Sequence, residues 1–548
     1  MLSDNNMLLG IPNPWNLPHV PSLRSTGSRA TLDQIQAWID TCVNTHQLCR
    51  SVSKTDTPLP TRVLDLGVDP SESAPIRLIE SAGKNGRYVT LSYCWGKAKF
   101  LKTTKDNYTR HKQGILFADL PRTFQHTIKV CRALGVRYLW IDALCIIQDD
   151  SQDWAAESVR MADVYQKSFF TLSATWGDSP DCGLFQDFDT ASESRIGPVA
   201  LRQVVHPTLT HITHHENEFP VLTRGWCYQE HLLSRRILYF TMWEVMLQCL
   251  ESTICECGSS IHKSRGTEQE KYKQFFCCPE DQHPASPSAT SPDVASDFWH
   301  VTVSDYTLLR LTYSSDKLPA ISGIATVIQR KTNWHYLAGL WRETLLTDLC
   351  WYVWPPPPAP PNATSSPCGG KPQKQRRKSP TWSWITIPHS NCIHYQAALL
   401  SFYQKMPIHL TLHASILDAG CTPLSSMSEV HSGFIVLECY MQQIPLTMMQ
   451  ALVMDLAQGL ALDEGLDTPL EEGPFYLIPM VAYVSGDEWF KYTGYTALVV
   501  TPAEEGKDEM VRVGLLICHV NPATGGKPGT YKIWERAVNG KKVRIRLI

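Results

Sequence analysis

The sequence predicts an α/β core with a mainly parallel sheet flanked by helices, followed by a helical segment and a β-rich C-terminal unit. Two observations support this fold class. Between about residues 88 and 250, short apolar runs alternate with stretches of helical periodicity, an order typical of a parallel sheet. After residue 381 the apolar runs are short and are broken by Gly, Asp and Pro, which indicates β-structure.

Four strands are expected in the core. Each is a short run rich in Val, Ile, Leu, Phe, Tyr or Thr, most of which favour strands. They lie near residues 88–94, 136–142, 169–175 and 236–241. In a parallel sheet their carboxyl ends meet at one edge, where open α/β sheets bind ligands.

Helices are expected to connect these strands. In the first connection, four apolar side chains from Phe124 to Leu134 recur at helical spacing, and Gly135 follows as a stop signal. Similar stripes occupy residues 153–165 and 223–233 in the next two connections. Strand and helix therefore alternate through the whole core.

The rest of the chain divides by composition. The Pro-, Ser- and Asn-rich start and two linkers without apolar periodicity are expected to be disordered. The basic cluster Lys374–Lys378 is consistent with a solvated linker or with a nuclear import signal. We expect a disordered N-terminus at 1–30, a helix and extended lead-in at 31–87, the core at 88–250, a linker at 278–293, a helical segment at 298–354, a Pro-rich basic linker at 355–380 and a β-rich domain at 381–548.

Charge and composition exclude several classes of partner. Lys and Arg total 50 and Asp and Glu total 53, a formal net charge of −3, so no basic excess favours nucleic acid or anionic lipid. No run of about 18 apolar residues predicts a membrane span, and no secretory signal is recognised. The 18 cysteines are scattered, as in reduced proteins, so we expect a cytoplasmic protein.

Neither a metal nor a cofactor is expected. Cysteines 249, 255, 257, 277 and 278 with His283 suggest zinc, but their spacing does not match paired CxxC knuckles. Asp142, Asp149 and Asp150 follow the second strand, where helix capping competes with metal binding. GxGxxG after a strand, GxxxxGK(S/T), HExxH and GxSxG are all missing, which disfavours the corresponding enzyme classes.

Four motifs occur in a fixed order along the core. They are Leu91–Gly96 (LSYCWG), Leu120–Phe124 (LPRTF), Leu139–Asp142 (LWID) and Arg224–Glu230 (RGWCYQE). Together they resemble the fungal heterokaryon incompatibility (HET) domain family. This resemblance implies a protein of fungal non-self recognition or cell-death signalling, with protein partners or self-assembly.

HET domains are regarded as distant relatives of TIR domains, and three segments resemble TIR motifs. Leu91-Ser92-Tyr93 is similar to the first TIR strand, Asp142 takes the acidic position after the second, and Trp226–Glu230 resembles the Trp-Cys-x-x-Glu of enzymatic TIR domains, whose Glu cleaves NAD. The resemblance implies catalytic Glu230, Trp226 and Asp142, and NAD-contacting Ser92, Tyr93, Trp95 and Gly96. NAD would be a substrate, with no resident cofactor.

The chemistry is consistent with this assignment, and alternatives remain open. Breaking the nicotinamide–ribose bond builds positive charge on the ribose, which one well-placed carboxylate can stabilise. Glu230 could instead form an ion pair with Arg235 or Arg236, with Trp226 in the core, and Glu157 is a second catalytic candidate. Whether the protein is an enzyme stays open: the alternatives are a non-enzymatic assembly module and a secondary-metabolism enzyme on the same scaffold.

Overall fold

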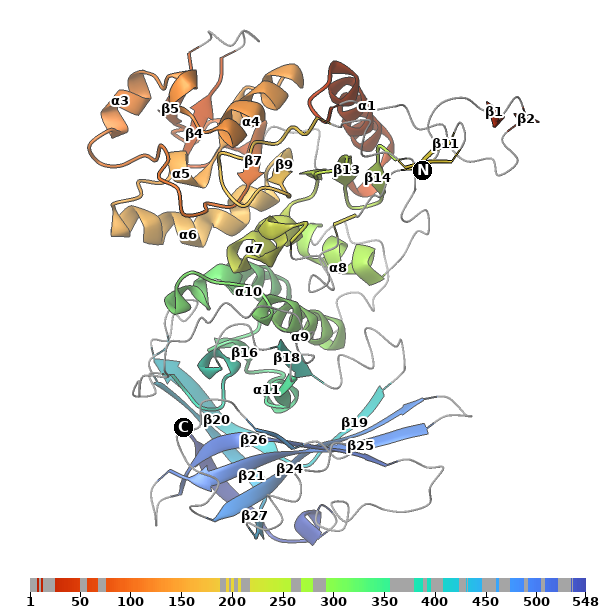
Figure 1. Cartoon of the computed structure of the whole chain (residues 1–548). Coiled ribbons are helices and arrows are strands. Elements are labelled where there is room, and N and C mark those ends of the chain that lie inside the picture. Colours follow the sequence, from red (N-terminus) through yellow and green to blue (C-terminus); the bar gives the residue numbers. More distant parts are fainter. Residues whose placement is uncertain are drawn as a thin grey trace. The chain divides into compact units, whose positions relative to one another are not determined.

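The computed structural model divides into two compact units, Met1–Ser286 and Pro287–Ile548 (Figure 1). It describes residues 7–8, 11–12, 25–49, 57–67, 75–187, 194–196, 199–201, 206–207, 217–257, 268–278, 292–354, 379–387, 392–395, 408–422, 430, 432–445, 460–462, 474–486, 491–503, 508–520, 534 and 536–548. Most of the expected disordered N-terminus and linkers, at 1–30, 278–293 and 355–380, lies outside these residues.

Within the described residues, the first unit is built on an eight-stranded sheet. Its order is β14 (Thr253–Cys255), β13 (Val245–Gln248), β12 (Ile237–Phe240), β9 (Phe170–Ala174), β7 (Tyr88–Ser92), β8 (Tyr138–Trp140), β4 (Arg62–Asp65) and β5 (Arg77–Glu80). The four strands expected from the sequence are β7, β8, β9 and β12. They are neighbours, and all three of their pairings are parallel.

The sheet as a whole is mixed, which corrects the expectation of a mainly parallel one. The extended lead-in supplies β4 and β5, and β13 and β14 follow β12, all through antiparallel pairings. The connection from β12 to β13 is a tight turn in which the Thr241 hydroxyl accepts the backbone N–H of Glu244 at 3.0 Å. So short a connection can join only antiparallel neighbours, because a parallel pair needs a long crossover.

The four parallel strands are added on both sides of β7, the first of them along the chain. Among the four parallel strands, the chain passes from β7 to its neighbour β8 and then to β9 and β12 on the other side of β7. Because crossovers between parallel strands are right-handed, this strand order implies α6 (Ser151–Gln166) and α7 (Gly225–Leu233) on one face and α4 (Arg122–Ala133) on the other. Consistently, α6 and α7 pack against each other. The strand order therefore changes direction between β7 and β9. In open α/β sheets, ligands commonly bind beside the carboxyl ends of the strands at such a point.

Local sequence accounts for the ends of these helices. Gly135, with φ of +67°, follows the last turn of α4 as its periodicity predicted. Asp150 is the N-cap of α6, and its carboxylate accepts the backbone N–H groups of Gln152 and Asp153. Capping thus explains Asp150 without a metal. Strand β7 is buried at every residue, as expected of a central parallel strand.

Further elements surround this sheet. The N-terminal helix α1 (Arg29–Thr45) is capped by Ser28, whose hydroxyl accepts the N–H of Thr31 at 3.1 Å. The others are α3 (Tyr108–Gln113), α5 (Asp142–Cys145), α8 (Glu268–Cys277), and the paired short strands β1 (Met7–Leu8) with β2 (Ile11–Pro12), β3 (Thr57–Pro58) with β6 (Asn85–Gly86), and β10 (Ser194–Ile196) with β11 (Val199–Leu201).

The second unit begins with helices and ends in a β-rich part, as expected. The helices are α9 (Pro292–Thr307), α10 (Pro319–Thr332) and the short α11 (Leu345–Asp348). Two small pairs follow, β15 (Tyr336–Leu337) with β16 (Leu340–Trp341) and β17 (Trp351–Trp354) with β18 (Cys392–Tyr395). Buried tryptophans fill the interior of this unit: Trp299, Trp341, Trp351, Trp382 and Trp384.

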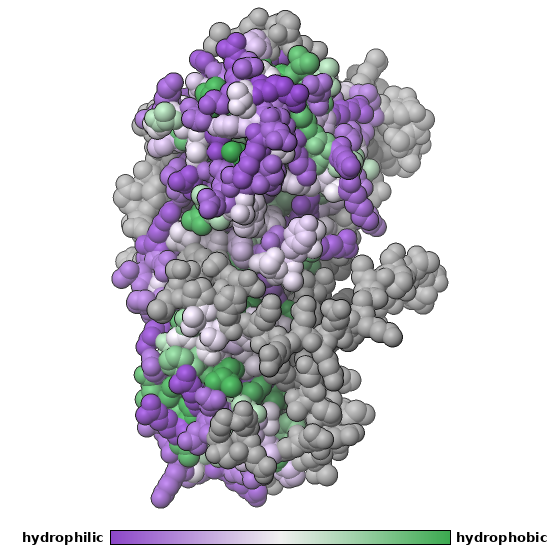
Figure 2. Space-filling view, turned by 90° about the vertical axis from the view of Figure 1, so that its left-hand side faces the viewer, coloured by the Kyte–Doolittle hydropathy of each residue, from purple (hydrophilic) through white to green (hydrophobic). Residues whose placement is uncertain are grey.

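Nine described strands form the large sheet of the second unit. Seven lie in the order β19 (Ile408–Leu412), β24 (Phe475–Gly486), β25 (Lys491–Pro502), β26 (Glu509–Val520), β27 (Lys542–Leu547), β21 (Ser432–Tyr440) and β20 (Ser415–Thr422), while β22 (Gln442–Ile444) pairs with β24 and β23 (Leu460–Leu462) with β26. This sheet exposes Leu410, Leu412, Leu417 and Val543. Figure 2 shows hydrophobic residues gathered on this unit, at the bottom of the view.

None of the described helices combines the length and the apolar character that a bilayer crossing requires.

Candidate functional site

Glu230 lies on α7 at the carboxyl edge of the parallel strands. A short 3-10 turn, η4 (Pro220–Thr223), leads into α7, which packs against β7 and α6 and buries almost all of its residues. The Glu230 side chain is 6% exposed. Among the described residues, no Lys, Arg or His forms an ion pair with it. Arg236 instead donates to Cys42 Sγ and Arg235 to the Cys277 carbonyl, so the alternative of an ion-paired Glu230 is not what the structure contains.

The environment of Glu230 favours its protonated form. Burial raises the pKa of Glu230 to about 7, and the negative charge of Asp142 adds to the rise. The Ser92 and Tyr165 hydroxyls and the Arg224 charge oppose it. The buried Oε2 atom has no hydrogen-bond partner among the described residues. Glu230 is therefore a buried carboxyl group with a raised pKa, a property common among functional carboxyl groups.

Asp142 joins the ends of two neighbouring strands. It follows β8 as the first residue of α5, where its Oδ1 accepts the N–H of Ala143 at 2.7 Å. Its Oδ2 accepts the indole N–H of Trp95, in the loop after β7, at 2.8 Å. Burial raises the pKa of Asp142, while these hydrogen bonds oppose the rise. Asp142 thus fixes the position of Trp95.

Ser92 and Tyr93 end β7 beside these carboxyl groups. Both side chains are buried. The Ser92 hydroxyl lies near enough to Glu230, and the Tyr93 hydroxyl near enough to Asp142, to lower the pKa of these carboxyl groups, but neither hydroxyl makes a well-formed hydrogen bond to a described residue. Burial raises the pKa of Tyr93, and the charges of Asp142 and Glu230 add to the rise, so the three groups lie close together. Buried polar atoms without partners are costly in folded proteins and call for an explanation. A bound polar ligand would supply their missing partners.

Arg224 brings positive charge to this site, and sequence reasoning did not single it out. It is the half-buried N-cap residue of α7. Although burial opposes the change, neighbouring Cys227, Cys94, Glu230 and Asp142 raise the pKa of Arg224. Its place at the start of the RGWCYQE motif was the available signal. We call Ser92, Tyr93, Asp142, Arg224 and Glu230 the carboxyl-edge cluster.

The other predicted site residues lie around this cluster. The Trp95 ring is half-buried, with the Lys102 Nζ 4.1 Å from its centroid. Trp226 packs edge-on against Trp154 of α6, with ring centroids 6.2 Å apart. Gly96 has φ of +62°, and a Cβ there would lie 2.9 Å from the Cβ of Ser179, so the loop after β7 requires glycine.

Burial disfavours the reactive thiolate form of the two cysteines near the cluster. Cys94 and Cys227 pack with Val221 in a small apolar group. Burial raises the pKa of Cys94 to about 11 and that of Cys227 above its ordinary value. Burial therefore favours the protonated thiol form of both cysteines.

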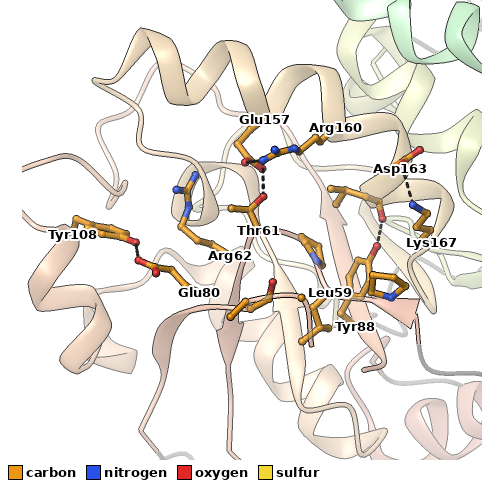
Figure 3. A pocket seen from close by; sticks show the side chains of 16 residues that line it. Leu59, Thr61, Arg62, Glu80, Tyr88, Tyr108, Glu157, Arg160, Asp163 and Lys167 are labelled. Carbon is orange, nitrogen blue, oxygen red and sulfur yellow. Dashed lines mark hydrogen bonds and ion pairs between the residues drawn. The ribbon is translucent and has the colours of Figure 1, made fainter. Parts of the chain in front are cut away.

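A pocket of about 590 Å³ lies at the opposite, amino end of β7, where Tyr88 contributes to its lining (Figure 3). Glu157, the second catalytic candidate, lines this pocket and pairs with Arg160 at 2.9 Å. Asp163 pairs with Lys167, also at 2.9 Å. These carboxylates already have cationic partners, unlike Glu230 in the carboxyl-edge cluster. Glu157 is thus an ion-paired residue of α6, away from Glu230.

Comparison with known proteins identifies one family. Residues 88–230 match the family model described as heterokaryon incompatibility protein (HET). No curated protein and no solved structure matches the chain. The matched range begins at the first residue of β7 and ends at Glu230, so it contains every site residue predicted from the sequence.

Proposed function

The chain is a heterokaryon incompatibility-type protein with its HET domain at residues 88–230, and we propose that this domain cleaves the nicotinamide–ribose bond of NAD. The cleavage would serve fungal non-self recognition or cell-death signalling, in which protein partners or self-assembly bring HET domains together. The observation that carries the proposal is Glu230, a buried carboxyl group with an unpartnered oxygen and a raised pKa of about 7. It lies at the carboxyl edge of the parallel strands, where open α/β sheets commonly bind ligands.

The reaction needs one carboxylate and no general acid. As the bond between C1′ of the ribose and the nicotinamide nitrogen breaks, its electron pair stays with the nitrogen. The positively charged ring therefore leaves as neutral nicotinamide. A water oxygen then bonds to C1′ and releases a proton, which yields ADP-ribose. Ionised Glu230 would stabilise the ribosyl cation between these steps, inside a site of low polarity where such stabilisation is strong.

Two cations near the cluster support the proposal that it binds the diphosphate of this substrate. Arg224 lies beside Glu230, and Lys102 lies over Trp95. Guanidinium and ammonium groups are the usual protein partners of phosphate oxygens. The Trp95 indole, fixed by Asp142, offers a flat face close to Lys102. We propose that these groups bind the phosphates and a ring of NAD while Ser92 and Tyr93 donate to ribose hydroxyls.

The pH dependence of cleavage is the first expected result. Because the ionised form of Glu230 stabilises the cation, kcat/KM should rise about tenfold per pH unit on the acid side of pH 7 and level off above it. Nicotinamide release measured across this range gives the profile. A rate that falls as pH rises through 7 would assign Glu230 the role of an acid and contradict the proposed mechanism.

The proposed function itself is tested by nicotinamide release from NAD with the purified full chain, over a wide range of protein concentrations. Release that increases more steeply than protein concentration would show that self-assembly activates the domain. No release at any concentration, together with retained toxicity on expression, would refute NAD cleavage and favour a non-enzymatic assembly module.

A further inference from the structure

Four metal-binding side chains meet at the end of α1, outside the carboxyl-edge cluster. They are Cys42, His46, Cys49 and Cys249, and one ligand atom from each lies within 4.8 Å of the other three. The His46 Nδ1 and the Cys249 Sγ are 3.3 Å apart. Three sulfurs and one imidazole nitrogen form the Cys₃His set that is typical of structural zinc.

The fold brings these residues together from distant parts of the sequence. Cys42 lies in the last turn of α1 and His46 is its C-cap, four residues on, so both share one helix face. Cys49 follows in the next turn. Cys249 comes directly after β13, 203 residues beyond His46. Two segments that the sequence places far apart thus converge on one point, and neither belongs to the matched HET range.

The geometry is suited to a tetrahedral ion. Zinc–sulfur and zinc–nitrogen bonds of about 2.3 and 2.0 Å separate neighbouring ligand atoms by about 3.5–3.8 Å at the tetrahedral angle. The ligand atoms here lie within 4.8 Å of one another, so no pair has to approach by more than about 1 Å to reach those separations. The three cysteines are at most 3% exposed, which fits a closed structural site without an open position.

The surroundings supply the charge that such a site needs. Arg236, which is buried, donates its Nε–H to Cys42 Sγ at 3.1 Å and an Nη2–H to the carbonyl of Cys49 at the same distance. Zn²⁺ with three thiolates and a neutral imidazole has a net charge of −1, which one guanidinium neutralises. Hydrogen bonds to ligating sulfur also orient the ligands and stabilise the thiolate.

We propose that Cys42, His46, Cys49 and Cys249 bind a structural zinc ion that fastens α1 to the β13 side of the sheet. A disulfide explains the group less well, because it would join two of the three sulfurs and leave the third sulfur and the imidazole without a role. Zinc uses all four side chains, and its binding free energy adds directly to the stability of the folded chain.

A second group of donors in the described part of the chain carries no such assignment. It contains His206, Glu244, Cys255 and Cys257. The sulfurs of Cys255 and Cys257 are 2.9 Å apart, closer than a tetrahedral zinc ion separates its ligands. This group serves as a comparison in the test, because it places two cysteines near a histidine without the required separation.

The test is the zinc content of the purified full chain, measured by mass spectrometry of the metal. We expect Cys249→Ser to contain one zinc ion per chain fewer than the wild type. Cys131→Ser, which removes a fully buried thiol of α4, and Cys257→Ser should both keep the wild-type content. A wild-type chain that stays zinc-free after incubation with ZnCl₂ and dialysis would overturn the proposal. Zinc that is lost from Cys257→Ser and kept by Cys249→Ser would also overturn it.

Two further measurements cover a Cys249→Ser chain that fails to fold. Cys249→His replaces one ligand with another and should retain the zinc ion. The wild type with EDTA should unfold at a lower temperature, and added ZnCl₂ should reverse the shift. Replacement of zinc by Co²⁺ should give the intense visible bands of tetrahedral cobalt with a sulfur-to-cobalt band in the near ultraviolet. EDTA that leaves the unfolding temperature unchanged, or cobalt without the sulfur band, would contradict the site.

Discussion

Glu230→Gln should lower the rate of nicotinamide release from NAD by about a hundred- to a thousandfold, or about 3–4 kcal/mol of transition-state stabilisation. Glutamine has nearly the shape of glutamate, so the change removes the charge and little else. Glu230 forms no ion pair with a described residue, so the substitution breaks no salt bridge, and Arg224 keeps the neighbouring charge of Asp142. The loss should appear in kcat, since the carboxylate interacts with a charge that exists only in the transition state.

The matched control is Glu157→Gln. Glu157 is equally buried, at 3% exposure, and lies on α6 at the other end of β7, in an ion pair with Arg160. We expect this variant to lose some stability and to keep its rate per folded molecule. Equal rates in the Glu230→Gln variant and the wild type would remove Glu230 from the mechanism. Equal losses in both variants would indicate an effect on folding and not on the reaction.

Local patterns predicted the parallel half of the sheet but not its edges. Strands β7, β8, β9 and β12 are continuous apolar runs, because central parallel strands are buried on both faces. The strand β5 has exposed residues at both ends, and β14 is half-exposed through most of its length, so neither shows that signal. The mixed character of the sheet follows from tight turns such as the one at Thr241, whose direction no periodicity encodes.

The sequence predicted the positions of those site residues that directly follow a strand. Ser92, Tyr93 and Asp142 end β7 and β8, so strand order alone placed them at one edge. The protonation of Glu230 was not predictable, because its pKa depends on burial and on Asp142, which is distant in sequence. The cysteines show the same limit. Sequence spacing grouped Cys249 with Cys255 and Cys257, whereas the fold separates them. Of the other members of that group, Cys277 and Cys278 pack with Cys249, and His283 lies outside the described residues.

Glu230→Gln should also stabilise the protein above pH 7, by up to about 3 kcal/mol. The pKa of Glu230 rises from an ordinary value of 4.5 to about 7 in the folded state. Between these values the folded chain holds a proton that the unfolded chain has released, so stability falls as pH rises from 4.5 to 7. Glutamine never ionises and escapes this loss. Urea unfolding should therefore show a gain above pH 7 that disappears below pH 4.5.

The sign of this change in stability distinguishes a functional carboxyl group from a structural one. If a glutamate stabilises the fold through its hydrogen bonds, its replacement by glutamine should lower the stability of the protein at every pH. A buried carboxylate kept for catalysis costs stability in the ionised form that the reaction uses, because burial disfavours its charge. Replacement of Glu157 by glutamine breaks the ion pair with Arg160 at 2.9 Å, so this variant should instead lose stability. A gain of stability in Glu230→Gln and a loss in Glu157→Gln would therefore identify Glu230 as a carboxyl group that destabilises the folded chain, as expected of a residue kept for function.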